Sequence, residues 1–203
     1  MNTLRISSAR FAALGLALAW LAFSTGCVSE DTAGEGSVRL EAGGGLALQS
    51  GFPYTEGGTE HAFADGWALE FTKYIVVVGD VALTEPGSGN VRASFAGPVA
   101  VDLKKDGSGT TEITTLTEVP AKRLDVEFSF LRASATTENR NVDPTDFDLM
   151  VSEGWSYLIE GVASKDGSQV TFYFGLDLPT RYYDCINGED QTQGLAVEAN
   201  KTI

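Results

Sequence analysis

The segment "WSYLIEGVASKDGSQVTFYFGLDL", residues 155–178, decides the fold that the sequence predicts. Trp155, Tyr157 and Ile159 alternate with smaller or polar residues, and a second alternating run follows "KDGS". Asp166-Gly167 is a favoured pair for a tight hairpin turn, because both turn positions need backbone angles that Asp and Gly tolerate. The segment therefore predicts a β-hairpin of two half-buried strands. On one face, the returning strand carries Val170, Phe172, Phe174 and Leu176.

The same period of two governs "KRLDVEFSFLRA", residues 122–133. An alternating strand places successive side chains on opposite faces of its sheet, so one face is expected in the core and the other in water. The residues expected in the core are Leu124, Val126, Phe128 and Phe130. Those expected in water are Arg123, Asp125, Glu127 and Ser129.

Short strands with glycine-rich turns continue along the rest of the chain. "YIVVVGDVAL", residues 74–83, is almost wholly apolar, so it is expected in the centre of a sheet with both faces covered. Residues 144–154 predict one short turn of helix. This pattern predicts an all-β protein, a single antiparallel β-sandwich, with an open barrel as the alternative. The other expected strands are Val38–Leu40, Ala68–Phe71, Tyr74–Leu83, Val91–Phe95, Val99–Leu103, Glu112–Leu116 and Leu195–Ala199.

The amino terminus has the three parts of a secretory signal: basic residues, an apolar run over residues 11–23, and small residues up to Gly26. The run is shorter than the roughly 20 residues that span a bilayer as a helix. "STGC", residues 24–27, resembles the lipobox of bacterial lipoproteins, although Ser24 stands where that motif usually has Leu. The alternative is ordinary cleavage after a small residue. We therefore expect a signal peptide over 1–26, a lipidated flexible tether over 27–36 and a β-sandwich domain over 37–203.

The lipobox resemblance implies that Cys27 carries diacylglycerol and an N-linked acyl chain such as palmitate. Several acyl chains give stable anchoring, since each buried methylene contributes about 0.8 kcal/mol. Similarity to enterobacterial lipoproteins implies that Val28, rather than Asp, directs the protein to the outer membrane. The expected location is the bacterial cell envelope, with the membrane as partner through the lipid.

The mature chain is strongly acidic. The full sequence has 14 basic and 28 acidic side chains, and removal of residues 1–26 takes away Arg5 and Arg10, which leaves 12 − 28 = −16. Such a surface repels nucleic acid and anionic head groups, so a nucleic-acid partner is excluded.

The motif F-x-D-G-W occurs at residues 63–67, within "FADGWALEFTKYIVVVGDVAL". Asp65 and Gly66 are expected to turn the chain, so that Trp67, Leu69 and Phe71 then alternate into the core. Together with residues 154–178, this run resembles a family of uncharacterised lipoproteins from soil-dwelling myxobacteria, over most of residues 60–178. The resemblance implies a location in the bacterial cell envelope and gives no information about a substrate.

Metal ligands are the first kind of site the sequence offers. His61, the only histidine, lies near Glu60 and Asp65, and imidazole and carboxylates can share one ion. Two acidic loops supply oxygens of the kind that calcium binds. Their candidate ligands are Asp143, Asp146 and Asp148 in the first loop, and Asp184, Asn187, Glu189 and Asp190 in the second. Cys185 is a candidate copper ligand, because acylation of Cys27 would leave it without a disulfide partner.

The sequence favours a non-enzymatic protein, since it contains no H-E-x-x-H, C-x-x-C, G-x-S-x-G or glycine-rich phosphate loop. Tyr182, Tyr183 and the aromatic strands are a candidate ligand-binding face, although core packing explains the aromatic content more simply. The predicted function is an envelope-anchored lipoprotein that acts as a binding or structural module for an unidentified protein or small ligand. The alternatives are a copper- or calcium-binding periplasmic protein and an unrecognised hydrolase.

Overall fold

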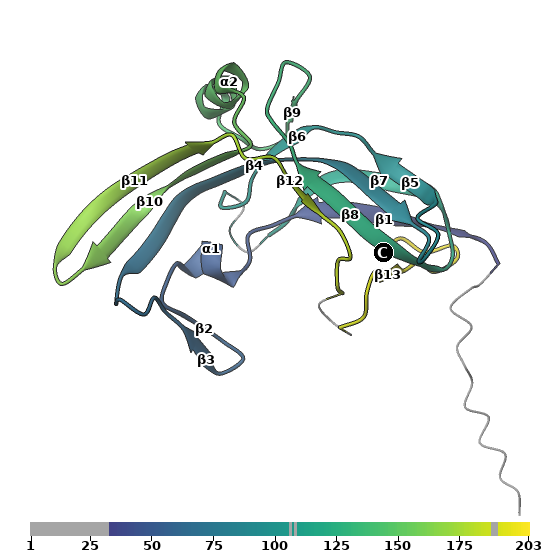
Figure 1. Ribbon diagram of the computed structural model, residues 1–203, viewed down its shortest axis with the longest axis horizontal. Coiled ribbons are helices and arrows are strands. Elements are labelled where there is room, and N and C mark those ends of the chain that lie inside the picture. Colours follow the sequence, from purple (N-terminus) through teal and green to yellow (C-terminus); the bar gives the residue numbers. More distant parts are fainter. Residues whose placement is uncertain (1–32, 106, 108, 188–190) are drawn as a thin grey trace, which may run out of the picture.

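The computed structural model describes residues 33–203 apart from 106, 108 and 188–190. The signal peptide, Cys27 and most of the tether therefore lie outside the described residues. The first strand begins at Glu35, within the range expected for the tether. The elements, shown in Figure 1, are β1 (Glu35–Ala42), α1 (Leu46–Ser50), β2 (Tyr54–Glu56), β3 (Thr59–His61), β4 (Ala68–Thr84), β5 (Val91–Phe95), β6 (Val99–Asp102), β7 (Thr111–Pro120), β8 (Arg123–Phe130), β9 (Glu138–Asn139), α2 (Pro144–Glu153), β10 (Tyr157–Lys165), β11 (Ser168–Leu176), β12 (Thr180–Tyr182) and β13 (Leu195–Ala196).

Strand β4 is the central strand of the main sheet. The two segments expected at Ala68–Phe71 and Tyr74–Leu83 are one strand of 17 residues, with an irregular register opposite Glu160 and Gly161. Strands β10 and β8 lie along one edge of β4, and β6 and β5 along the other. The sheet continues from β10 to β11 and from β8 to β12 and β13. A strand this long lets four neighbours pair with β4. The main sheet is arched (Figure 1).

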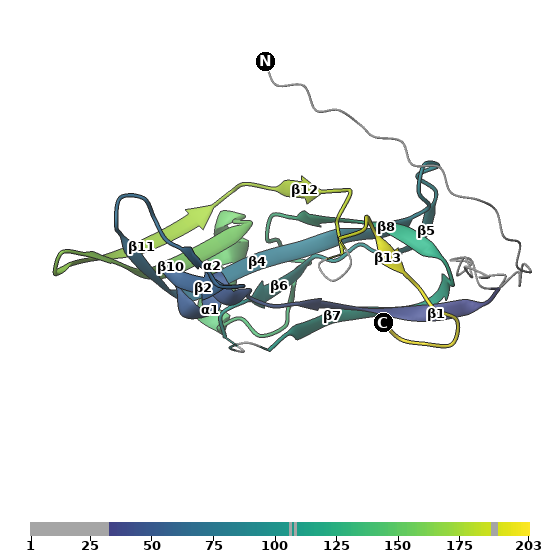
Figure 2. The ribbon, with the colours of Figure 1, turned by 90° about the horizontal axis from the view of Figure 1, so that it is seen from below.

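Both faces of β4 are covered, as the apolar run predicts. Ile75 and Val77 point to the convex face, where α2 packs over them. Val76 and Val78 point to the concave face and pack with residues of β1 and β7. These two strands form a separate antiparallel layer beside the main sheet (Figure 2). The predicted all-β sandwich is confirmed, and the described sheets do not close into a barrel.

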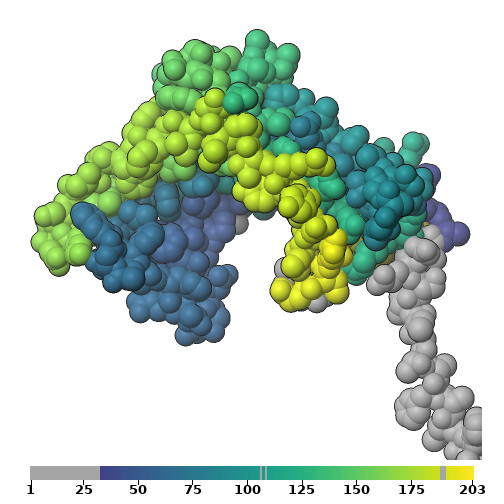
Figure 3. Space-filling view, viewed as in Figure 1, coloured from purple at the N-terminus to yellow at the C-terminus, as the bar shows by residue number. Residues whose placement is uncertain are grey.

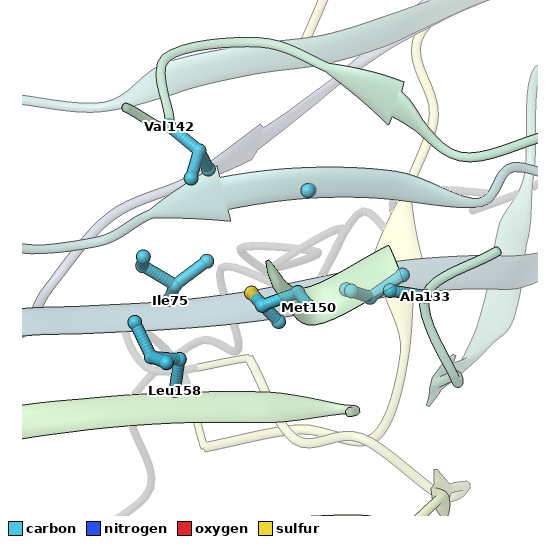
Figure 4. Packing of buried hydrophobic residues seen from close by; sticks show 7 residues of the cluster. Ile75, Ala133, Val142, Met150 and Leu158 are labelled. Atoms are coloured by element: carbon cyan, nitrogen blue, oxygen red, sulfur yellow. The ribbon is translucent and has the colours of Figure 1, made fainter. Parts of the chain in front are cut away.

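Helix α2 covers the convex face. Asp143 caps its first turn by accepting a hydrogen bond from the Thr145 N–H at 2.9 Å, and Pro144 is suited to the start of a helix. Gly154, in the left-handed conformation with φ 68°, ends it. The helix is ten residues long, so it exceeds the single turn expected. Met150 points from α2 into the cluster that contains Ile75, Ala133, Val142 and Leu158 (Figure 4).

The hairpin of β10 and β11 is confirmed, together with its turn. Asp166 and Gly167 both have positive φ, 50° and 80°, and Lys165 pairs with Ser168 across them. The side chains of β11 are not packed in a core as expected, because β11 is an edge strand that, among the described strands, pairs only with β10. Val170 and Phe174 are more than half exposed.

One expectation for residues 122–133 is wrong. Ser129, expected in water, is buried, and it lies between Gly79 of β4 and Arg181 of β12. On the opposite face Leu124 is buried and Phe128 is half-buried. Phe128 lies at the edge of the hollow on the concave side.

Candidate functional site

Two adjoining cavities lie on the concave side of the arched sheet, and they share Leu103 and Phe130 in their linings. We call them together the concave groove. Its first cavity has a volume of about 330 Å³ and its second about 510 Å³. Both volumes fall in the range typical of small-molecule sites. In Figure 3 the arch is hollowed between the blue segment of α1, β2 and β3 and the yellow carboxyl-terminal segment.

The first cavity is apolar and lies between β1 and the main sheet. Strand periodicity points Val76 and Val78 of β4, and Val126, Phe128 and Phe130 of β8, to this one face. The remaining lining residues come from β1 and its end, from β4, β6 and β7; they are Leu40, Glu41, Ala42, Gly43, Val81, Leu103 and Ile113.

Of the residues that the structure describes, Glu41 is the only charged one in the linings of the two cavities. Its carboxylate is already paired: one oxygen lies 3.1 Å from Nε of Arg39, and the other accepts a hydrogen bond from Thr110 Oγ1 at 3.0 Å. The groove therefore presents no unpaired charge to a ligand.

The second cavity brings tyrosine hydroxyls together in an apolar setting. Tyr74 pairs with Ile159 across β4 and β10, and Tyr157 stands two residues before Ile159 on the same face. Tyr182 arrives from β12, next to Thr180. The full lining is Leu48, Tyr74, Leu103, Phe130, Tyr157, Ile159, Leu176, Leu178, Thr180 and Tyr182.

These hydroxyls lie close enough to influence one another. The Tyr157 hydroxyl donates to Thr180 Oγ1 at 3.4 Å, while that oxygen donates to the Leu178 carbonyl at 3.1 Å. Burial raises the pKa of Tyr157, and Tyr182 and Tyr74 raise it further. Burial and Tyr182 also raise the pKa of Tyr74. Tyr74 and Tyr157 are accordingly neutral near pH 7 and able to donate hydrogen bonds.

Aromatic packing makes the wall between the cavities. The Phe128 and Tyr182 rings stack at 4.8 Å across β8 and β12, and Phe130 meets Tyr157 and Tyr182 edge-on at 5.2 and 5.4 Å. Such pairs contribute about 0.5–1.5 kcal/mol beyond their buried area. The groove is thus preformed on one side, because its rings hold one another in place.

Helix α1 borders the second cavity through Leu48. Lys104 donates to the carbonyl oxygens of Leu48 and Gln49, at 3.0 and 2.8 Å, and the Gln49 amide donates to the Leu103 carbonyl at 2.9 Å. These bonds tie a short helix to the end of β6. They fix Leu48 at the edge of the groove.

The residues predicted as metal ligands are distributed over different parts of the fold. His61 is in β3, where its ring stacks on Tyr54 at 4.7 Å. Asp65 accepts from the Trp67 N–H at 3.5 Å, which supports the expected turn. Trp67, Leu69 and Phe71 are half-buried rather than in the core. This end of β4 pairs with β10 and contacts the short helix α1, and it lies outside the clusters of buried residues. Glu60 is exposed.

The residues of the first acidic loop cap helix α2 or belong to it. Asp143 is the helix cap, and its hydrogen bond with the Thr145 N–H lowers the pKa of its carboxyl. Asp146 pairs with Lys73 at 2.9 Å, and Asp148 is exposed. This loop is on the convex side and the β2–β3 hairpin on the concave side (Figure 1). His61 and these carboxylates therefore do not share a site.

The second acidic loop joins β12 to β13. Asp184 accepts from the Gln193 amide at 3.0 Å, and the main chain of Asn187 bonds that of Gln191 and Thr192. Glu189 and Asp190 lie outside the described residues. Cys185 is a half-buried free thiol whose pKa is raised, first by burial and then by Asp184 and Glu127. Within the described ranges, no group of three or more His, Cys, Asp or Glu side chains is placed to hold a metal ion.

The groove was only partly predictable. Tyr182 was a candidate for a ligand-binding face and does line the groove; Tyr183, its neighbour, is two-thirds exposed and lines neither cavity. Tyr74 and Tyr157 were assigned only to strands. The signal that could have identified them is their position at the start of an apolar run, because the hydroxyl of a tyrosine there can reach the border of the core.

The fold and the groove define a class: an all-β protein with an open apolar groove on the concave face of its main sheet. No protein-family model, curated protein or solved structure matches the chain. In the part of the chain that the structure describes, neither helix has the length and apolar character needed to cross a bilayer.

Proposed function

We propose that this protein is an envelope-anchored bacterial lipoprotein that acts as a non-enzymatic binding module and holds an apolar ligand in the concave groove. The observation that carries the proposal is the groove itself: two adjoining cavities lined almost wholly by aliphatic and aromatic side chains and open to solvent. An apolar concave surface with a few convergent polar groups is the usual form of a small-molecule site.

Exposed apolar residues extend this surface beyond the cavities. Leu176 and Leu178 line the second cavity and are still 37% and 59% exposed. Phe174 and Val170 continue the same face of β11. Contiguous apolar surface of this kind marks interaction sites, because exposing it to water costs about 25 cal/mol per Å².

The anchor belongs to the proposal on the strength of the sequence alone. Acylated Cys27 would hold the protein at the envelope, with the outer membrane as the expected location, and membership of the myxobacterial lipoprotein family stays a prediction. Intact mass of the protein from its native membrane tests the anchor. The expected result is a chain beginning at Cys27 with the added mass of a diacylglycerol and an acyl group; a disulfide between Cys27 and Cys185 would contradict it.

Binding is tested with the fluorescent apolar probe N-phenyl-1-naphthylamine. The wild type is expected to bind the probe, and Ile159→Trp, which adds bulk inside the second cavity, to bind it at least tenfold more weakly. Thr171→Trp is the matched control, because Thr171 is an exposed residue of β11 outside both linings. Failure of the wild type to bind, or equal binding by Ile159→Trp, would refute the proposal. The metal-binding and hydrolase alternatives stay predictions.

A further inference from the structure

The concave groove has two chemically different ends. The first cavity carries aliphatic and aromatic groups, with Glu41 already paired to Arg39 and Thr110. The second collects phenol and threonine hydroxyls around the long Tyr157–Thr180 hydrogen bond of 3.4 Å. A ligand that fills both ends must combine an apolar chain with a group that forms hydrogen bonds.

Charge restricts that polar group. Among the described residues, no lysine or arginine lines either cavity, and the one carboxylate has its partners. A charged head placed here would lose hydration without gaining an opposite charge, which costs several kcal/mol in an apolar site. A cation would also find few free ring faces, because Phe128 and Tyr182 stack on each other. The head group is therefore neutral.

The hydroxyls fit a neutral head that accepts hydrogen bonds. The Tyr157 bond to Thr180 is at the long end of the hydrogen-bond range, so its donor can turn to a better acceptor at little cost. Tyr182 is 40% exposed, which leaves its tip accessible from solvent. An ester, amide or alcohol oxygen can accept a hydrogen bond from Tyr157 in place of its long bond to Thr180.

We infer that the ligand is a neutral single-chain amphiphile, with its head at the hydroxyls of Tyr74, Tyr157 and Tyr182 and its chain in the first cavity. The inference rests on the proposed binding function and gives it a ligand class. Phe130 and Leu103, which line both cavities, lie where the head meets the chain.

The test compares head groups on a common twelve-carbon chain, each used below its micelle concentration. Monododecanoylglycerol, dodecanoate and dodecyltrimethylammonium displace N-phenyl-1-naphthylamine from the full wild-type chain. The neutral amphiphile is expected to displace the probe at a concentration at least tenfold lower than either charged one. Equal or better displacement by a charged amphiphile would overturn the inference and leave the proposed function intact, whereas absence of probe binding removes both.

Variants then locate the head. Tyr157→Phe combined with Tyr182→Phe keeps both rings and removes two hydroxyls, so it is expected to weaken binding of the neutral amphiphile by on the order of tenfold. The melting temperature should stay close to the wild-type value, and the weakening is expressed relative to the affinity of the same variant for the probe. Tyr173→Phe is the control, since Tyr173 lines neither cavity. Equal weakening by the control, or none by the double variant, would place the head elsewhere and overturn the inference.

Discussion

The contact between α2 and the convex face gives the largest effect on stability that we predict. Met150 is fully buried and packs in one cluster with Ile75, Val77 and Leu158. Met150→Ala removes the main apolar anchor of a ten-residue helix and leaves a cavity that neighbouring β-sheet cannot close. Substitutions of this kind cost about 2–5 kcal/mol. Total stabilities of domains are about 5–15 kcal/mol, so the variant should lose a large part of its stability.

The assay is urea unfolding followed by circular dichroism, with Asp148→Ala as the control on an exposed position of the same helix. The control should change the free energy of unfolding by less than about 0.5 kcal/mol. Because α2 covers the face opposite the concave groove, folded Met150→Ala should bind N-phenyl-1-naphthylamine like the wild type. A loss of stability below about 1 kcal/mol, or a loss of probe binding under conditions where the variant is folded, would refute the assignment of α2 to core packing alone.

Three further predictions concern a close packing contact, an ion pair and the free thiol. Gly175→Ala places a Cβ 2.2 Å from the Trp155 indole, so the ring must move; we expect about 1–3 kcal/mol of destabilisation and a change in tryptophan fluorescence. Ion pairing, chiefly with Lys122, lowers the Glu85 pKa from 4.5 to about 2. The stability contributed by ionised Glu85 is complete above about pH 4.5 and is lost as the pH falls through about 2. In Glu85→Gln the melting temperature should therefore change less with pH over this window than in the wild type. Burial raises the Cys185 pKa, so iodoacetamide should label it more slowly at pH 8 than it labels free cysteine.

Each of these predictions has a matched control. Gly45→Ala adds a Cβ where no atom lies within 4 Å and should be close to neutral. Glu56→Gln replaces an exposed glutamate of β2 and should keep the wild-type pH dependence. The thiol is labelled in a chain with Cys27→Ser, so that only Cys185 reacts. Unchanged fluorescence in Gly175→Ala, an unchanged pH profile in Glu85→Gln, or labelling of Cys185 as fast as free cysteine would contradict the corresponding prediction.

The longer strands and the main hairpin turn followed from the sequence because their causes are local, whereas the short strands β2, β3, β9 and β12 were not predicted. Alternation with period two identifies a strand wherever one face is apolar, as in residues 122–133, and Asp166-Gly167 supplies the positive φ angles of the turn within two residues. The apolar run of β4 also predicted its own coverage on both faces. The capped segment that became α2 predicted a helix, although not its length.

Burial and the groove were decided by tertiary structure. Val76 and Phe174 are both apolar residues of predicted strands, yet one is buried and the other half exposed, because β1 and β7 pack against β4 whereas β11, of the strands described, pairs only with β10. Tyr74, Tyr157 and Tyr182 are far apart in the chain; the pairing of β4 with β10, and of β8 with β12, brings their hydroxyls into one cavity. Backbone and turn preferences act over a few residues, whereas register and layer packing depend on contacts between distant segments. The sequence by itself therefore determined where the longer strands form, whereas only the tertiary structure decided where the short strands β2, β3, β9 and β12 pair and which strand faces stay open to bind.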